Sequence, residues 1–198
     1  MAKIAFSKGI VPLLLCTLLI LSCASAQNRG ITLQVGVPFP TEDTFLTNYD
    51  GIFALGLVYT QPTVFSIQLR PAVEFERFTL EGAGTDINQL TFGLGLGYAV
   101  ALSSRLRVVP EIGVGLTRLG FDVPAEFDVS LDSQSGFLSW VAVEPTYKML
   151  ERMSLGISLA YRTAFLEAPE PFNGISGDTA FNKRTHVLQV AGGVMYHF

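Results

Sequence analysis

The chain has 198 residues, of which 49% are hydrophobic and only 15% charged, and its formal net charge at pH 7 is −4. An acidic chain offers no electrostatic attraction to nucleic acid, so composition argues against a nucleic-acid partner. The many apolar residues and few charges are typical of a protein that resides in a membrane.

The N-terminal segment has the three parts of a secretory signal peptide. Lys3 and Lys8 precede a short apolar run at 10–21, and Ala24-Ser25-Ala26 supplies a cleavage site of small residues. This order of a basic region, an apolar region and an Ala-x-Ala site is the pattern of an exported precursor. We therefore expect residues 1–26 to be a cleaved signal peptide.

Residues 27–198 are then the mature chain, which we expect to form a single domain. Both cysteines, Cys16 and Cys23, lie in the removed segment, so the mature chain offers neither a disulfide nor a thiolate site. Its formal charge combines 11 Lys and Arg with 17 Asp and Glu. Two alternatives for the N-terminus are a retained membrane anchor, for which the apolar run is short, and acylation of Cys23 as in a lipoprotein.

After Arg29, apolar residues alternate with small or polar residues at a period of two, which predicts strands and no helices. Eight strands are expected, at 31–37, 51–60, 64–78, 90–102, 106–119, 137–149, 153–163 and 187–198. The last segment alternates most regularly. One of its faces carries Leu188, Val190, Gly192, Val194, Tyr196 and Phe198, and the other carries Gln189, Ala191, Gly193, Met195 and His197.

The connections between these strands alternate long and short, beginning and ending with a long one. With an even number of antiparallel strands, the three short turns and both chain ends fall on the same side. The prediction is an all-β fold, an eight-stranded antiparallel up-and-down transmembrane β-barrel. A lipocalin-like soluble barrel or a β-sandwich would place a solvated polar face on nearly every strand, and several strands here lack one.

Five charged residues share the face that would line the barrel interior. They are Arg70, Glu74, Glu111, Glu144 and Arg162. Arg70, Glu111 and Glu144 lie at similar distances from the short turns, so we expect them to cluster and to pair, because buried charges persist only when paired. The cluster is either an ion-pair plug or the gate of a narrow pore, and the small bore of eight strands favours the plug.

The sequence indicates no catalytic residue, cofactor site or metal site. Gly93, Gly95 and Gly97 lie on one face of a strand with no helix after them, so they do not form a phosphate-binding loop. His186 and His197 are the only imidazoles, and no third group in the sequence orients a Ser/His pair. An enzyme that modifies lipids of the outer leaflet is kept only as a rival hypothesis.

From Gln27 to Phe198 the chain resembles the small outer-membrane β-barrel family that includes the OmpX-like proteins and the membrane domain of OmpA. The resemblance rests on the terminal Tyr196-His197-Phe198, on the alternation before it and on the hairpin spacing. It implies a Gram-negative outer membrane, contact with its lipids, and periplasmic chaperones. It also implies that Tyr196 and Phe198 act as the signal read by the barrel-assembly machinery.

The function expected from sequence is that of a non-enzymatic outer-membrane barrel, present as a monomer, with a plugged polar interior and a structural or surface-interaction role. The resemblance allows roles in envelope integrity, adhesion and small-solute passage. A narrow pore for small solutes or ions is the main alternative, and the lipid-modifying enzyme is the second.

Overall fold

The computed structural model describes residues 29–41, 46, 48–63, 65–80, 86–122, 133–166 and 184–198. The expected signal peptide, 1–26, lies outside these residues. Eight long strands and one short strand follow each other along the chain: β1 (Gly30–Pro40), β2 (Tyr49–Pro62), β3 (Ile67–Leu80), β4 (Asp86–Tyr98), β5 (Val100–Ala101), β6 (Leu106–Asp122), β7 (Gln134–Leu150), β8 (Met153–Leu166) and β9 (Arg184–His197). No helix in the described part of the chain is long and apolar enough to span a membrane.

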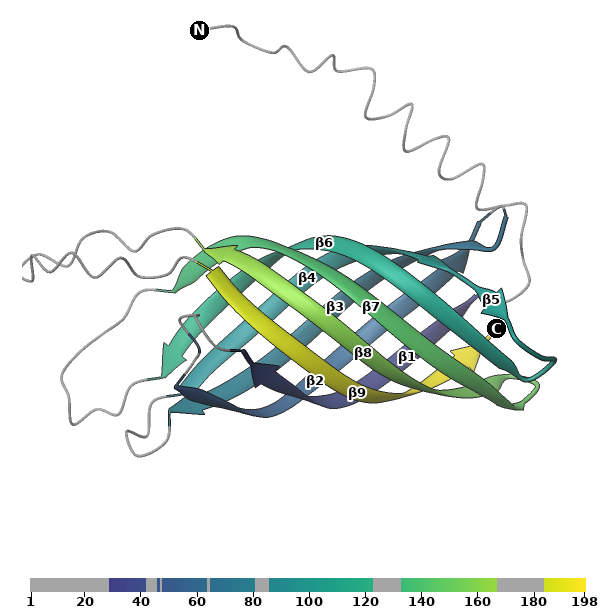
Figure 1. Ribbon diagram of the computed structural model, residues 1–198, viewed down its shortest axis with the longest axis horizontal. Helices are drawn as coiled ribbons and strands as arrows, with labels where there is room; N and C mark the ends of the chain where they lie inside the picture. The colour runs from purple at the N-terminus through teal and green to yellow at the C-terminus, as the bar shows by residue number, and fades with distance from the viewer. Residues whose placement is uncertain are drawn as a thin grey trace, which may run out of the picture.

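The strands form a closed antiparallel barrel (Figure 1). Each long strand pairs with the long strands next to it in sequence, and β4 pairs directly with β6 because β5 is only a short addition to β6. The first and last strands, β1 and β9, close the cylinder through eleven residue pairs, from Gly30 with His197 to Pro40 with Val187. The predicted eight-stranded up-and-down barrel is confirmed.

The two ends of the barrel differ in their connections. The short turns, β5 and the chain terminus marked C lie at one end in Figure 1, which we call the turn end. The C-terminal ends of β1, β3, β6 and β8 lie at the opposite end, which we call the loop end because the longer connections of the sequence follow these strands. In Figure 1 the strands run obliquely to the long axis, as the geometry of a closed barrel requires.

The outside of the barrel is apolar on every long strand. Its exposed large residues include Leu33, Leu55, Val73, Leu94, Ile112, Val141, Ile157 and Val190. Leu116 leaves as much as 68% of its surface uncovered. A continuous belt of this kind would aggregate in water, whereas a lipid bilayer covers it without cost.

The turn between β2 and β3 begins later than the alternation predicts. The predicted strand starts at residue 64, but β3 starts at Ile67, because Phe65 and Ser66 have positive φ angles of 56° and 64°. The backbone N–H and the hydroxyl of Thr63 both donate to the Ile67 carbonyl, at 2.7 and 2.9 Å. Phe65 is 86% exposed in this turn. Because Phe65 is apolar, it fits the alternation of a strand. The alternation does not depend on the sign of φ, so it did not reveal the turn.

Several strands extend further toward the loop end than predicted. The segment before residue 90 was expected to be a loop, yet β4 begins at Asp86; similarly, β8 continues to Leu166. The strand expected at 90–102 ends at Tyr98, and only Val100–Ala101 resumes pairing, as β5. β6 likewise continues to Asp122, beyond the predicted end at 119, and β7 begins at Gln134, before the predicted start at 137.

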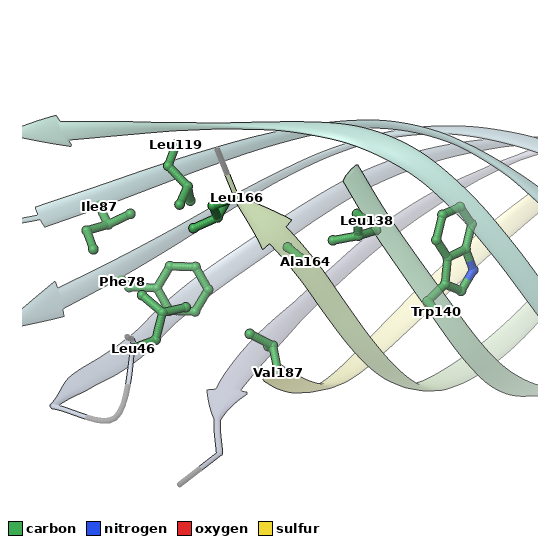
Figure 2. Packing of buried hydrophobic residues seen from close by; sticks show 9 residues of the cluster. All are labelled: Leu46, Phe78, Ile87, Leu119, Leu138, Trp140, Ala164, Leu166 and Val187. Carbon is green, nitrogen blue, oxygen red and sulfur yellow. The ribbon is translucent and has the colours of Figure 1, made fainter. Parts of the chain in front are cut away.

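The barrel interior contains an apolar cluster near the loop end, which the polar interior expected from sequence does not include. Figure 2 shows nine buried side chains gathered there: Leu46, Phe78, Ile87, Leu119, Leu138, Trp140, Ala164, Leu166 and Val187. Ile87 and Leu166 belong to segments expected to be loops, so the sequence did not place them on the inner face. Polar residues such as Gln89 and Thr185 are buried at this end too, whereas the charged residues of the interior lie nearer the middle of the barrel.

Candidate functional site

The polar middle of the barrel contains two groups of ion pairs that cross the lumen. The first, the Arg70 group, consists of Arg70 on β3, Glu111 on β6 and Glu144 on β7. Arg70 Nε lies 3.1 Å from Glu111 Oε2, and Arg70 Nη2 is ion-paired with Glu144. Gln34 on β1 donates its amide N–H to the same Glu144 carboxylate at 3.5 Å. Only 1% of Arg70 is exposed, so all of its charge is compensated inside the protein.

Glycines on β4 allow Arg70 to reach Glu111. β4 lies between β3 and β6 and pairs Gly95 with Arg70, and Gly97 with Glu111. A Cβ atom on Gly95 would lie 2.2 Å from Glu111 Oε1, a distance that no real contact allows. The inner face of β4 therefore carries no side chain where the ion pair passes over it.

The second group, the Arg162 group, consists of Arg162 on β8 with Glu74 and Glu76 on β3. Arg162 Nη1 lies 3.1 Å from Glu76 Oε1, and Arg162 Nη2 is ion-paired with Glu74. Arg162 and Glu76 are both buried. Because β3 and β8 are not neighbours in the sheet, this pairing spans the lumen rather than running along the wall.

Trp140 on β7 contacts both groups. Its indole N–H donates to Glu111 Oε1 over 2.8 Å. The guanidinium carbon of Arg162 lies 6.0 Å from the centre of the indole ring, at the outer limit of a cation–π contact. The ring fits because Gly93 and Gly113 lie beside it, where added Cβ atoms would be 2.5 and 2.0 Å from indole carbons.

Little free space remains around these side chains. The cavity between the two groups has a volume of about 20 Å³, enough for about one water molecule. Three carboxylates and two guanidiniums line this cavity, so the lining has a formal surplus of one negative charge. Within the described residues, no set of three His, Cys, Asp or Glu side chains has a geometry that would hold a metal ion.

The structure brings all five of the interior residues selected from sequence into these two groups. It adds Glu76, which has the same strand parity as Glu74, so an inward position follows from the alternation. It also adds Trp140, whose inward parity was visible but whose contacts with both groups depend on which strands face each other across the lumen. That relationship is set by the tilt and stagger of the closed sheet, not by the local sequence.

The two residues expected to form the assembly signal lie at the turn end. Tyr196 pairs with Ile31 on β1 and with Met153 on β8, and its side chain is exposed on the outer wall. Phe198 follows β9; its N–H donates to the Arg29 carbonyl at 3.1 Å, and its ring stacks on Tyr59 with centroids 6.4 Å apart. Both aromatic rings therefore belong to the outer surface near the membrane boundary.

Each histidine has a hydroxyl partner. His197 Nε2 lies 2.8 Å from Ser154 Oγ, a buried contact at the turn end. His186 Nδ1 lies 3.0 Å from Thr163 Oγ1 on the outer wall, and its ring stacks on Tyr161. In the part of the chain that the structure describes, no carboxylate hydrogen-bonds to either imidazole, so neither pair has the third member that orients a catalytic base.

Comparisons with known proteins identify the fold. No protein-family model matches the chain, and no curated protein matches it. Among solved structures, Neisserial surface protein A (NspA) is 16% identical, with a TM-score of 0.61 over 88% of this chain and 98% of its own. The attachment invasion locus protein Ail of Yersinia pestis is 12% identical, with a TM-score of 0.55 over 87% and 99%. A major outer membrane protein from Thermus thermophilus is 18% identical, with a TM-score of 0.54 over 86% and 99%.

At these identities the likeness concerns the fold. The chain has the fold of the small outer-membrane β-barrels, and the resemblance expected from sequence is confirmed at that level. The apolar belt on the outer wall is the surface that such a barrel presents to lipid.

Proposed function

We propose that this chain, which has the fold of bacterial outer-membrane barrels, is a non-enzymatic barrel protein whose lumen is closed by the Arg70 and Arg162 groups. Its role is structural or lies in surface contacts made through the long connections at the loop end. The observation that carries the proposal is the cavity of about 20 Å³ left between two ion-pair groups that cross the lumen. A solute larger than water cannot pass unless these pairs separate.

The plug is costly to open because each pair is buried. Arg70 joins β3 to β6 and β7, and Arg162 joins β8 to β3. Removing one partner of a buried ion pair typically costs about 3–5 kcal/mol, since the other charge is left uncompensated. Separation of both groups at once is therefore a rare event, which supports a closed barrel whose register the pairs fix.

A narrow cation pore is the second candidate. The surplus of carboxylates in the lining supports it, because negative charge in a constriction attracts cations and repels anions. In that case the ion pairs would act as a gate instead of a plug. The lipid-modifying enzyme has weaker support: Thr163 and His186 are in contact on the outer wall, but among the described residues no third group orients them. Unchanged outer-leaflet lipid on overexpression would count against this enzyme.

Export and assembly complete the proposal. Residues 1–26 would direct the chain across the inner membrane and be cleaved after Ala26, or Cys23 would be acylated instead. Periplasmic chaperones would then deliver the chain to the barrel-assembly machinery, which would read Tyr196 and Phe198. The assembled barrel would be a monomer surrounded by outer-membrane lipids.

Planar-bilayer conductance of the refolded mature chain tests the plug. The wild-type barrel is expected to carry no steady current. Alanine at Arg70, Glu111 and Glu144 removes the Arg70 group, and alanine at Arg162, Glu74 and Glu76 removes the Arg162 group. A folded variant that lacks both groups is expected to conduct, whereas a variant that lacks only the Arg70 group should stay closed. The matched control is Glu151→Ala, an exposed carboxylate in the turn between β7 and β8. A steady wild-type current would support the pore, and a silent folded variant without either group would show that these groups are not the barrier.

A further inference from the structure

The outer wall of the barrel carries a groove near the loop end, over β4, β6, β7 and β8. The cavity has a volume of about 450 Å³. Its lining is mainly apolar and includes Leu90, Phe92, Leu116, Phe137 and Phe165, together with the polar Arg118 and Ser135. It opens on the face that a membrane would cover, and it is separate from the polar interior.

Strand register builds the groove from two rows of side chains. The row nearer the middle of the barrel is apolar: Phe92 pairs with Leu116, Leu116 with Phe137, and Phe137 with Phe165. The row nearer the loop end pairs Leu90 with Arg118, and Arg118 with Ser135. Two steps along a strand separate the rows, about 7 Å. The short side chain of Ser135 leaves a hollow between its larger neighbours.

Two guanidinium groups border this apolar row. Arg118 is exposed and donates from Nε and Nη2 to Ser133 Oγ, at 3.1 and 2.8 Å. Arg184 on β9 lies over Phe165, with its guanidinium carbon 5.3 Å from the ring centre. Neither is ion-paired with a carboxylate of the described residues. Arg77, an arginine on the outer wall of β3 at the same end, differs because it is ion-paired with Asp86.

The spacing of the two cations favours a ligand with two anionic groups. Arg118 is on β6 and Arg184 is on β9, three strand spacings apart, which is roughly 14 Å along the wall. A guanidinium is the side chain best suited to bind a phosphate through paired N–H groups. An acyl chain is the ligand part that fits an apolar hollow facing the bilayer.

We infer that this groove is a binding site for a diphosphorylated lipid of the outer leaflet, with one acyl chain against Phe92, Leu116 and Phe137 and its phosphates on Arg118 and Arg184. The inference rests on the proposed function, because only an outer-membrane barrel would place the loop end in that leaflet. It names the class of lipid bound and the residues that select it.

Native mass spectrometry of the refolded mature chain tests the site, with diphosphoryl lipid A as the probe. Monophosphoryl lipid A and phosphatidylethanolamine are added in parallel at the same concentration. One diphosphoryl lipid A is expected to remain bound per barrel, with the other two lipids retained more weakly. Arg118→Gln is expected to reduce its retention about tenfold, the effect of losing one charge-assisted hydrogen bond.

Two further variants make the result specific. Ser135→Trp fills the groove without changing charge and is expected to reduce retention to a similar extent. Arg77→Gln removes an arginine of the same end that does not line the groove, and retention should stay at the wild-type level. Heat-modifiable mobility on gels establishes that each variant is folded.

Several outcomes would overturn the inference. If lipid retention is unchanged in both Arg118→Gln and Ser135→Trp, the groove is not the binding site. If Arg77→Gln loses as much lipid as Arg118→Gln, general charge attraction explains the retention. A lipid-free dimer that Leu116→Ala dissociates would mean that a second copy of the chain occupies the groove. A folded barrel without bound lipid contradicts this inference alone, whereas failure to insert into lipid vesicles contradicts the proposed function.

Discussion

The indole N–H of Trp140 donates a hydrogen bond to Glu111 across 2.8 Å, and through this bond the tryptophan is tied to the Arg70 group. The face of the same ring lies near Arg162, so one side chain connects both ion-pair groups. Trp140 is 8% exposed and also belongs to the apolar cluster at the loop end. It therefore lies where the charged groups meet the apolar cluster.

Trp140 is the single tryptophan of the chain, which makes its orientation directly measurable. In vesicles that contain brominated lipids, we expect little quenching of its fluorescence, because the ring points into the lumen. The double variant Trp140→Phe and Phe137→Trp moves the fluorophore to the outer wall of the same strand, and its emission should be strongly quenched. Equal quenching of the two proteins would contradict the inward position.

Loss of Arg162 should be far more damaging than loss of a surface arginine. Arg162→Met leaves Glu74 and Glu76 buried without a cation, and we expect the free energy of unfolding to fall by about 3–5 kcal/mol. Adding Glu76→Gln removes one of those charges and should restore part of the loss. Urea unfolding in lipid vesicles measures all four corners of this cycle. Strictly additive costs would show that the two side chains do not interact.

Arg152→Met serves as the control for that cycle. Arg152 is exposed in the turn between β7 and β8, and its replacement should change the free energy of unfolding by no more than about 0.5 kcal/mol. A similar loss in both arginine variants would mean that net charge, and not the buried pairing, determines stability.

Two glycines on opposite faces should respond differently to the same substitution. Gly113→Ala places a methyl group 2.0 Å from the Trp140 ring, and overpacking of this kind costs about 1–3 kcal/mol. Gly192 faces the membrane with no atom within 4 Å of an added Cβ, so Gly192→Ala should be neutral or slightly stabilising. Urea unfolding compares them, and equal effects would contradict the packing around Trp140.

The fold was largely predictable because each strand has one face toward lipid and the other toward the lumen. This arrangement imposes a period of two on the sequence of every strand. The alternation predicted for β9 agrees with the burial of its residues. Leu188 and Tyr196 face outward, and Gln189 and Met195 face inward. The turn at Phe65 was missed because a positive φ leaves no mark in an apolar pattern. The early start of β4 was missed because Asp86 and Asn88 read as loop residues, although they lie on a strand beyond the apolar belt.

The candidate site was predictable only in part. Parity and distance from the turns were sufficient to select Arg70, Glu111 and Glu144 as neighbours. The Arg162 group required knowledge of which wall β3 faces across the lumen, which depends on how the whole sheet is staggered when it closes. The groove on the outer wall was invisible in the sequence, because it arises from side chains of four strands brought into register.

Two roles of the terminal residue Phe198, as an assembly signal and as a stabilising contact, can be tested separately. The stacking of Phe198 on Tyr59 is worth only about 0.5–1.5 kcal/mol, so Phe198→Ala should still refold in vitro. If the barrel-assembly machinery reads this residue, the folded fraction in outer membranes of living cells should fall several-fold. Heat-modifiable mobility measures both, with Phe65→Ala, an exposed aromatic of the same end, as the control. An unchanged cellular yield would remove Phe198 from the assembly signal.

The seam between β1 and β9 determines the order in which the chain can fold. Gly30 and His197, 167 positions apart, are partners in it, so its closure has the highest contact order that the domain permits. Until β9 is present, β1 has a row of unpaired backbone groups, and each of these costs several kcal/mol in hydrocarbon. An open sheet of the first seven long strands is therefore unstable in the bilayer. A chain that ends before β9 therefore leaves the paired edge of β1 open, and we expect it not to insert as a stable barrel.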